Sequence, residues 1–193
     1  MTWRHGSVGP SLNASCPGLT FPCAHAFSQV MTTIEIPSPV GPLALEARNG
    51  LLVALRFDGR GEGAAAEPGS ELAAAAFQLA EYFSGKRRVF ELPLAQPGAA
   101  FDREVLKVVG EIPCGERTSY GQVTAKLGLR RDQVRKVAAA IGRNPLPILV
   151  PCHRVVGADG SLTGYGGGLE RKARLLALEA GQLTLAPTAA LTR

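Results

Sequence analysis

The chain has 193 residues, of which 46% are hydrophobic, and no apolar run approaches the length that a membrane span needs. Its first thirty residues lack the compact apolar segment of a secretory signal, so we expect a cytoplasmic protein without a membrane partner. The net charge of +5 is concentrated in residues 101–182, which hold 13 Lys or Arg and 8 Asp or Glu. This excess suits a polyanionic partner, but a solvated basic surface explains it equally well.

The four cysteines are irregularly spaced, which does not fit a disulfide framework in a chain of this size. Cys16 and Cys23 stand near histidines, but their separation is not the C-x₂₋₄-C spacing of common zinc sites. We therefore predict no metal site.

Residues 1–30 differ in character from the rest of the chain, and we expect a disordered extension with Met31 as the natural start. Residues 32–57 predict a sheet of three antiparallel strands. Asn49 and Gly50 lie between two apolar runs, and this pair is a strong signal for a type I′ hairpin turn.

A linker rich in glycine, alanine and proline follows over residues 59–69. Ser70 is suited to cap a helix, apolar residues then keep helical spacing, and Gly85 stands where a helix often ends. Sheet and helix together predict a small α/β unit. Residues 93–98 indicate a second linker.

The second half of the chain predicts short helices, at about 102–109, 120–127, 132–141 and 169–180. Asp102 and Asp132 are suited to cap the first and third of them. The tight, glycine-containing turn between the second and third is typical of a helix-turn-helix, with Gln133 and Arg135 on faces that can meet DNA. The alternative is an ordinary αα-hairpin with a charged outer face.

A potential nucleophile and a potential base, Cys152 and His153, follow the apolar segment 148–150, which we predict to be a buried strand. A thiol is a strong nucleophile only as thiolate, and a neighbouring imidazole promotes that form. Taken alone, the pair favours a small core cysteine beside a hydrogen-bonded loop histidine.

Three motifs change this interpretation: Asn-Pro-x-Pro-Ile from Asn144, Pro-Cys-His-Arg-Val from Pro151, and Gly-Tyr-x-Gly-Gly-Leu from Gly164. In this order and spacing, residues 101–180 resemble the catalytic domain of the O6-alkylguanine-DNA alkyltransferases, the methylated-DNA–protein-cysteine methyltransferases. Residues 31–92 resemble the small N-terminal domain of that family more weakly.

The resemblance implies an α+β fold. A small RNase H-like domain of antiparallel sheet and helix is expected at 31–94, a helical winged helix-turn-helix domain at 95–182, and a tail at 183–193. The implied activity is DNA repair by irreversible, single-turnover transfer of the alkyl group of O6-alkylguanine to Cys152, with O4-alkylthymine as a further candidate. We expect a monomer that binds double-stranded DNA and needs no cofactor.

The resemblance also implies the catalytic roles. Cys152 accepts the alkyl group, His153 takes the thiol proton through a water, and Glu179 orients that histidine. Tyr120 protonates the leaving guanine, and Asn144 braces the active-site turn. Without the resemblance, Glu179 would be a solvated carboxylate at a helix end.

Because the target atom lies inside a duplex, the base must be flipped into a pocket. The resemblance places Arg135 in the gap left in the stack, on a recognition helix that also carries Gln133.

Further residues are expected around the flipped base. Tyr165 would stack on the base or wall the pocket, and the alternative is an anchoring core aromatic. The run Gly166-Gly167-Gly168 would permit positive φ and close approach of the backbone to the base, and the alternative is a flexible surface loop. Lys172 matches a family lysine near the pocket, although a lysine in such a charged cluster is commonly solvated.

Two other classes compete with this interpretation. One is a non-enzymatic binder of alkylated bases, but such proteins lack the acceptor cysteine that this chain has in Cys152. The other is a helix-turn-helix transcription factor, which leaves the Pro-Cys-His-Arg motif and Glu179 unexplained.

Overall fold

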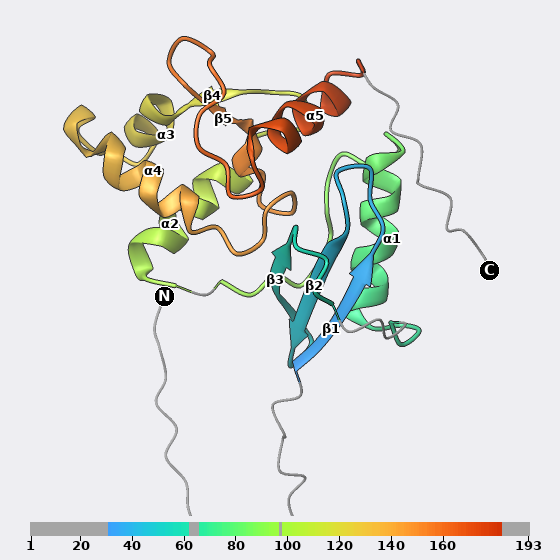
Figure 1. Cartoon of the computed structure of the whole chain (residues 1–193). Helices are drawn as coiled ribbons and strands as arrows, with labels where there is room; N and C mark the ends of the chain where they lie inside the picture. Colours follow the sequence, from blue (N-terminus) through green and yellow to red (C-terminus); the bar gives the residue numbers. More distant parts are fainter. Residues whose placement is uncertain (1–30, 62–65, 97, 183–193) are drawn as a thin grey trace, which may run out of the picture.

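The computed structural model describes residues 31–61, 66–96 and 98–182 (Figure 1). A sheet unit comprises β1 (Met31–Ile36), β2 (Leu43–Arg48), β3 (Leu51–Arg56) and α1 (Glu71–Phe83). A helical unit comprises α2 (Ala100–Gly110), β4 (Thr118–Ser119), α3 (Tyr120–Lys126), η1 (Arg131–Gln133), α4 (Val134–Gly142), η2 (Cys152–Arg154), β5 (Val155–Val156) and α5 (Leu169–Glu179). The expectations for the N-terminal extension, its two cysteines and the C-terminal tail lie outside the described residues. Within the described ranges, every helix is too short or too polar to cross a bilayer.

The sheet has three antiparallel strands, as the sequence predicts, and the strand order is β1-β2-β3. Asn49 has a φ of 52° and Gly50 a φ of 76°, which are the left-handed conformations that a type I′ turn requires at both positions. The predicted hairpin between β2 and β3 is therefore confirmed.

Helix α1 packs on one face of this sheet (Figure 1). Its cap is the predicted one, because the hydroxyl of Ser70 accepts a hydrogen bond of 3.2 Å from the backbone N–H of Ala73. Gly85 follows the helix with a φ of 75°. Leu72 and Leu79 lie on the apolar face of the helix and are buried in the core.

The predicted caps of two later helices are wrong. Asp102 lies in the first turn of α2, whose cap is Ala99, and its carboxylate binds the guanidinium of Arg143 at 2.7 and 2.8 Å. Asp132 lies in the 3₁₀ turn η1, so α4 begins only at Val134. Both aspartates lie in a first helical turn and not at the N-cap. A carboxylate is favourable at the N-cap and in the first turn alike, so the sequence does not distinguish the two positions.

The predicted strand at 148–150 is also wrong. Residues 145–150 form a closed turn in which the N–H of Val150 donates to the carbonyl of Leu146 at 2.8 Å, and Ile148 has a φ of 73°. Pro145 and Pro147 lack the N–H groups that a strand would use. The segment is nevertheless buried, and a short apolar run alone does not distinguish a strand from another buried conformation.

This active-site turn packs on the sheet unit. Ile148 and Leu146 join the leucines of the sheet and of α1 in one core, together with Leu175 from α5. The N–H of Leu55 in β3 also donates to the carbonyl of Pro145 at 2.8 Å. The turn that precedes Cys152 is therefore supported by both units.

The expected linker at 93–98 is partly an additional pairing partner for β3. The N–H of Leu52 donates to the carbonyl of Pro93 at 2.9 Å, and the N–H of Ala95 donates to the carbonyl of Leu52 at 2.8 Å. This contact covers part of an edge strand that would otherwise expose its backbone groups.

Candidate active site

The thiol of Cys152 is buried directly after the active-site turn, at the start of η2. Asn144 closes this turn, because its Oδ1 accepts from the N–H of Leu146 at 3.0 Å and its Nδ2 donates to the carbonyl of Val150 at 2.8 Å. These two bonds fix which side of the amide carries the hydrogens. The same Nδ2 lies 3.1 Å from the sulfur, so it donates toward it.

The environment of Cys152 keeps its sulfur protonated at rest. Burial raises the pKa of the thiol, while the hydrogen bond from Asn144 and the charge of Lys172 act in the opposite direction. The net shift is upward, so a reactive thiolate at this position would have to be formed by a nearby base.

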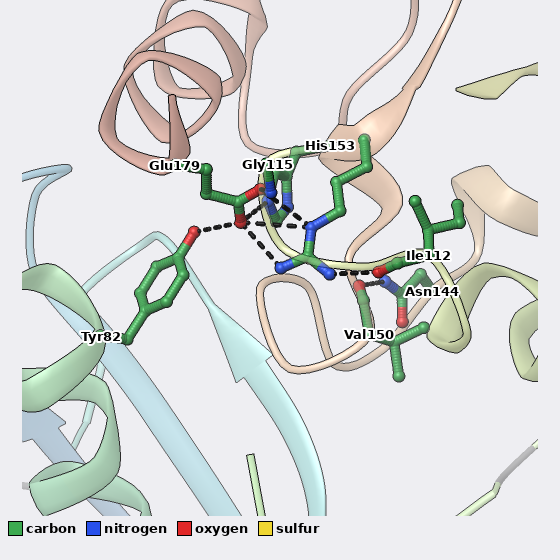
Figure 2. A network of polar contacts seen from close by, with 8 residues as sticks. Tyr82, Ile112, Gly115, Asn144, Val150, His153 and Glu179 are labelled. Atoms are coloured by element: carbon green, nitrogen blue, oxygen red, sulfur yellow. Dashed lines mark hydrogen bonds and ion pairs between the residues drawn. The ribbon is translucent and has the colours of Figure 1, made fainter. Parts of the chain in front are cut away.

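His153 is fully buried, and its Nε2 lies 2.8 Å from Oε1 of Glu179 (Figure 2). Burial lowers the pKa of this histidine despite the adjacent carboxylate, so the ring is neutral at physiological pH. A carboxylate only accepts, and Nε2 must therefore carry the hydrogen. The unprotonated Nδ1, which has no partner among the described residues, is then the atom that can take a proton.

Glu179 remains ionised although it is buried, because donors surround it (Figure 2). Arg154 donates to it through Nη2 at 2.8 Å and Nε at 2.9 Å, the N–H of Gly115 donates at 3.1 Å, and the hydroxyl of Tyr82 donates at 2.7 Å. Burial alone would raise the pKa of the carboxyl. Its bonds to His153 and Arg154 outweigh burial and hold that pKa well below its usual range.

Sequence reasoning missed Arg154, Gly115 and Tyr82 as partners of Glu179. For Arg154 a signal existed, since the residue stands beside His153 in the motif and a buried guanidinium needs an anionic partner. Tyr82 gave no such signal, because it stands 97 positions from Glu179 in the chain. The bond from Gly115 uses only a backbone N–H, which every residue except proline has.

Lys172 is buried and not solvated. Its Nζ donates to the carbonyl of Val155 at 2.6 Å and to the carbonyl of Thr163 at 2.7 Å, so it ties β5 to the loop before α5. Burial lowers the pKa of its ammonium, against the influence of nearby Cys152. The charge of Lys172 in turn favours the thiolate form of Cys152.

Of the two tyrosines predicted for the site, Tyr165 belongs to the loop before α5 and Tyr120 contacts that loop. The hydroxyl of Tyr120 is 3.2 Å from the carbonyl of Thr163, and burial raises its pKa, so it retains a proton to donate. Tyr165 packs edge-on to the ring of His153, with 6.5 Å between centroids. Burial raises the pKa of Tyr165 as well.

A cavity of about 580 Å³ reaches Cys152. Both units line it: Phe57 follows β3, Pro147 belongs to the active-site turn, and Gly166 and Gly167 come from the loop before α5. This volume lies within the range of small-molecule pockets.

Within the run Gly166-Gly167-Gly168, the expected positive φ is present at Gly168, at 88°, but not at Gly166 or Gly167. Gly167 is constrained by space instead, because a Cβ there would lie 2.7 Å from the ring of Phe57. A glycine lets the backbone pass against that ring.

Arg135 and Gln133 lie apart from this network. Arg135 is exposed at the start of α4, and none of the described residues forms a hydrogen bond or ion pair with its guanidinium. The side chain of Gln133 accepts a bond of 3.1 Å from the N–H of Arg130 at the start of η1. Both residues occupy the second segment of the helix-turn-helix formed by α3, η1 and α4.

The ionised state of Glu179 predicts how stability depends on pH. Its folded pKa is lower than the ordinary value of 4.5, so its contribution is complete above that value and is lost as the pH falls below it. Glu179→Gln should remove this acid dependence and lower the free energy of unfolding near pH 7 by about 3–5 kcal/mol, because Arg154 loses its buried partner. Urea denaturation at a series of pH values measures both effects.

Glu170→Gln is the matched control, since Glu170 is exposed on the same helix and, among the described residues, pairs only with Arg174 at the surface. It should cost less than about 0.5 kcal/mol. An unchanged acid slope in Glu179→Gln would show that this carboxyl is not the group responsible.

Comparison with known proteins agrees with this geometry. The profile described as 6-O-methylguanine DNA methyltransferase, DNA binding domain, matches residues 100–181, and the profile for its ribonuclease-like domain matches residues 31–96. The methylated-DNA–protein-cysteine methyltransferase of Mycolicibacterium paratuberculosis is 42% identical over 149 residues, which cover 75% of this chain and 89% of that protein.

Solved structures share the fold. The crystal structure of Mycobacterium tuberculosis O6-methylguanine methyltransferase matches with a TM-score of 0.70 and 38% identity, covering 80% of this chain and 95% of that one. The crystal structure of Mycobacterium tuberculosis OGT in complex with DNA gives a TM-score of 0.71 and 39% identity, with 81% and 96% covered. The expected α+β fold of two units is confirmed, and the chain belongs to the family of methylated-DNA–protein-cysteine methyltransferases, the 6-O-methylguanine DNA methyltransferases.

Proposed function

We propose that Cys152 is the cysteine to which this family member transfers the alkyl group when it repairs O6-alkylguanine in DNA. One observation carries the proposal: a buried thiol at a cavity stands next to a neutral histidine, His153, whose proton-accepting Nδ1 is defined by its bond to Glu179. The relatives' activity, alkyl transfer from DNA to a protein cysteine, needs such a nucleophile and such a base.

The proposed transfer is a single displacement. The thiol proton passes through a water to Nδ1 of His153, and the sulfur of Cys152 attacks the alkyl carbon. The carbon–sulfur bond forms as the bond between that carbon and O6 breaks, and its electron pair goes to the guanine. The guanine takes a proton from the hydroxyl of Tyr120, which regains one from His153.

The product explains single turnover. The alkylated sulfur is a thioether. Removing the alkyl group again would have to expel a thiolate, which is a poor leaving group, and the sulfur no longer carries a proton that a base could take. None of the groups described around Cys152 is a nucleophile placed to remove the alkyl group. The proposed reaction consumes no cofactor, since the nucleophile and the base both come from the chain.

The substrate base is part of a DNA strand, and the similar OGT of Mycobacterium tuberculosis has been solved in complex with DNA. We propose that α3 and α4 engage the duplex and that Arg135 occupies the space left by the flipped base. The exposure of Arg135 and the basic character of residues 101–182 support this role. We further propose that the protein acts as a monomer in the cytoplasm and that O4-alkylthymine is a second substrate.

Transfer to Cys152 can be read directly by intact-mass analysis after mixing the protein with a duplex that contains O6-methylguanine. We expect one hydrogen to be replaced by one methyl group, located by peptide mapping on the fragment that holds Cys152. Cys152→Ser should show no gain, whereas Cys114→Ser should gain the methyl group as the parent does, since Cys114 does not line the cavity. A folded, reduced protein that gains no methyl group would contradict the proposal.

A substitution at Arg135 distinguishes base flipping from the chemical step of alkyl transfer. Arg135→Ala should slow transfer from duplex O6-methylguanine by about tenfold or more, while transfer from free O6-benzylguanine, which needs no flipping, should change little. Rapid-quench assays on the two substrates measure this difference. Arg48→Ala removes the same charge from the sheet unit and serves as the control; equal losses on both substrates in Arg135→Ala would rule out a flipping role.

A further inference from the structure

The sheet unit reaches the catalytic relay through one side chain. Tyr82, in the last turn of α1, places its hydroxyl 2.7 Å from Oε1 of Glu179 (Figure 2). Among the described residues, no other side chain of the sheet unit forms a hydrogen bond with Glu179, His153 or Cys152. The bond therefore joins the two units at a group that the proposed chemistry uses.

The geometry fixes the direction of this bond. Burial and the neighbouring carboxylate raise the pKa of Tyr82 well above its usual value, so the phenol keeps its proton and donates it. The ring has little freedom, because it packs against Phe83 and Phe90 with centroid distances of 5.3 and 5.4 Å.

Tyr82 competes with His153 for one oxygen. Oε1 of Glu179 accepts from the hydroxyl of Tyr82 at 2.7 Å, while Nε2 of His153 and Nη2 of Arg154 each lie 2.8 Å away. A carboxylate oxygen has limited lone-pair capacity, so each donor reduces the negative charge available to the others. Removing the phenolic donor should make Oε1 a stronger partner for a protonated His153.

We propose that Tyr82 is a positioning residue through which the sheet unit sets the orientation and the basicity of the His153–Glu179 pair. The proposal rests on the proposed function, because it assigns this pair the task of deprotonating Cys152. It gives the sheet unit an indirect part in catalysis, through Glu179, in addition to its support of the active-site turn.

Other groups around the pair come from different elements and stay in place when only the phenolic oxygen is removed. Arg154 faces Glu179 from η2, and Cys114 lies near it in the segment before β4. Lys172 of α5 acts on His153 through its charge. A change that follows loss of the hydroxyl is therefore attributable to Tyr82.

The test is the pH dependence of methyl transfer in Tyr82→Phe, which keeps the ring and removes the hydroxyl. In the parent protein, the rate should fall toward acid pH as His153 becomes protonated. In the variant, the acid limb should move upward by about half a pH unit, because the imidazolium is better stabilised. Rates of transfer from duplex O6-methylguanine between about pH 4.5 and about pH 8 give the two midpoints.

Phe90→Leu is the matched control, since it removes one aromatic neighbour of the Tyr82 ring while the contact with Phe83 and the phenolic hydroxyl remain. Its acid limb should coincide with that of the parent. An acid limb that does not move in Tyr82→Phe, or that moves equally in Phe90→Leu, would overturn the inference and leave Tyr82 with a packing role.

A second readout is independent of alkyl transfer. Titration of the imidazole of His153 by NMR, without DNA, should show the same upward shift of its pKa in Tyr82→Phe. If the parent protein transfers no methyl group, the proposed function fails, whereas an unchanged titration in a parent that does transfer contradicts only the inference about Tyr82.

Discussion

The site depends on the hydrogen bonds and the ion pair that surround the buried carboxylate of Glu179. A charge removed from water is tolerated only when donors surround it, and here the donors come from α1, from the segment before β4 and from η2. Satisfying one carboxylate therefore requires the sheet unit and the helical unit to pack in a particular way. It also sets the tautomer of His153: burial lowers the pKa of the ring, the charge of Arg154 acts in the same direction, and the carboxylate then requires the hydrogen of the neutral ring on Nε2.

This arrangement explains how an unreactive thiol can serve as a nucleophile. Cys152 is protected at rest, since burial raises its pKa, and the base that we propose for its activation, His153, is oriented by its bond to Glu179. The hydrogen bond from Asn144 and the charge of Lys172 both favour the thiolate, so in the proposed reaction they would stabilise the charge that develops on the sulfur. A protein that is consumed by its reaction gains from such control, because premature alkylation or oxidation of the thiol would inactivate it.

Local signals in the sequence predicted much of the fold. The Asn49-Gly50 turn and the Ser70 cap depend on neighbouring residues alone, and both are present. The conformation of the turn at Ile148 was not predictable from its apolar run, because proline placement and the amide of Asn144 decide it. The motifs indicated Cys152, His153 and Glu179, but the partners that hold Glu179 are brought in by tertiary packing. Tyr82 is the clearest case, since it comes from the other unit.

The protonation state of the His153 ring is the most direct test of the role assigned to Glu179. Nitrogen NMR of histidine-labelled protein near pH 7 distinguishes the two neutral tautomers from the imidazolium. We expect a neutral ring with hydrogen on Nε2 and none on Nδ1. A hydrogen on Nδ1, in either the other tautomer or the imidazolium, would leave no acceptor for the thiol proton and would contradict the role of the Glu179 carboxylate.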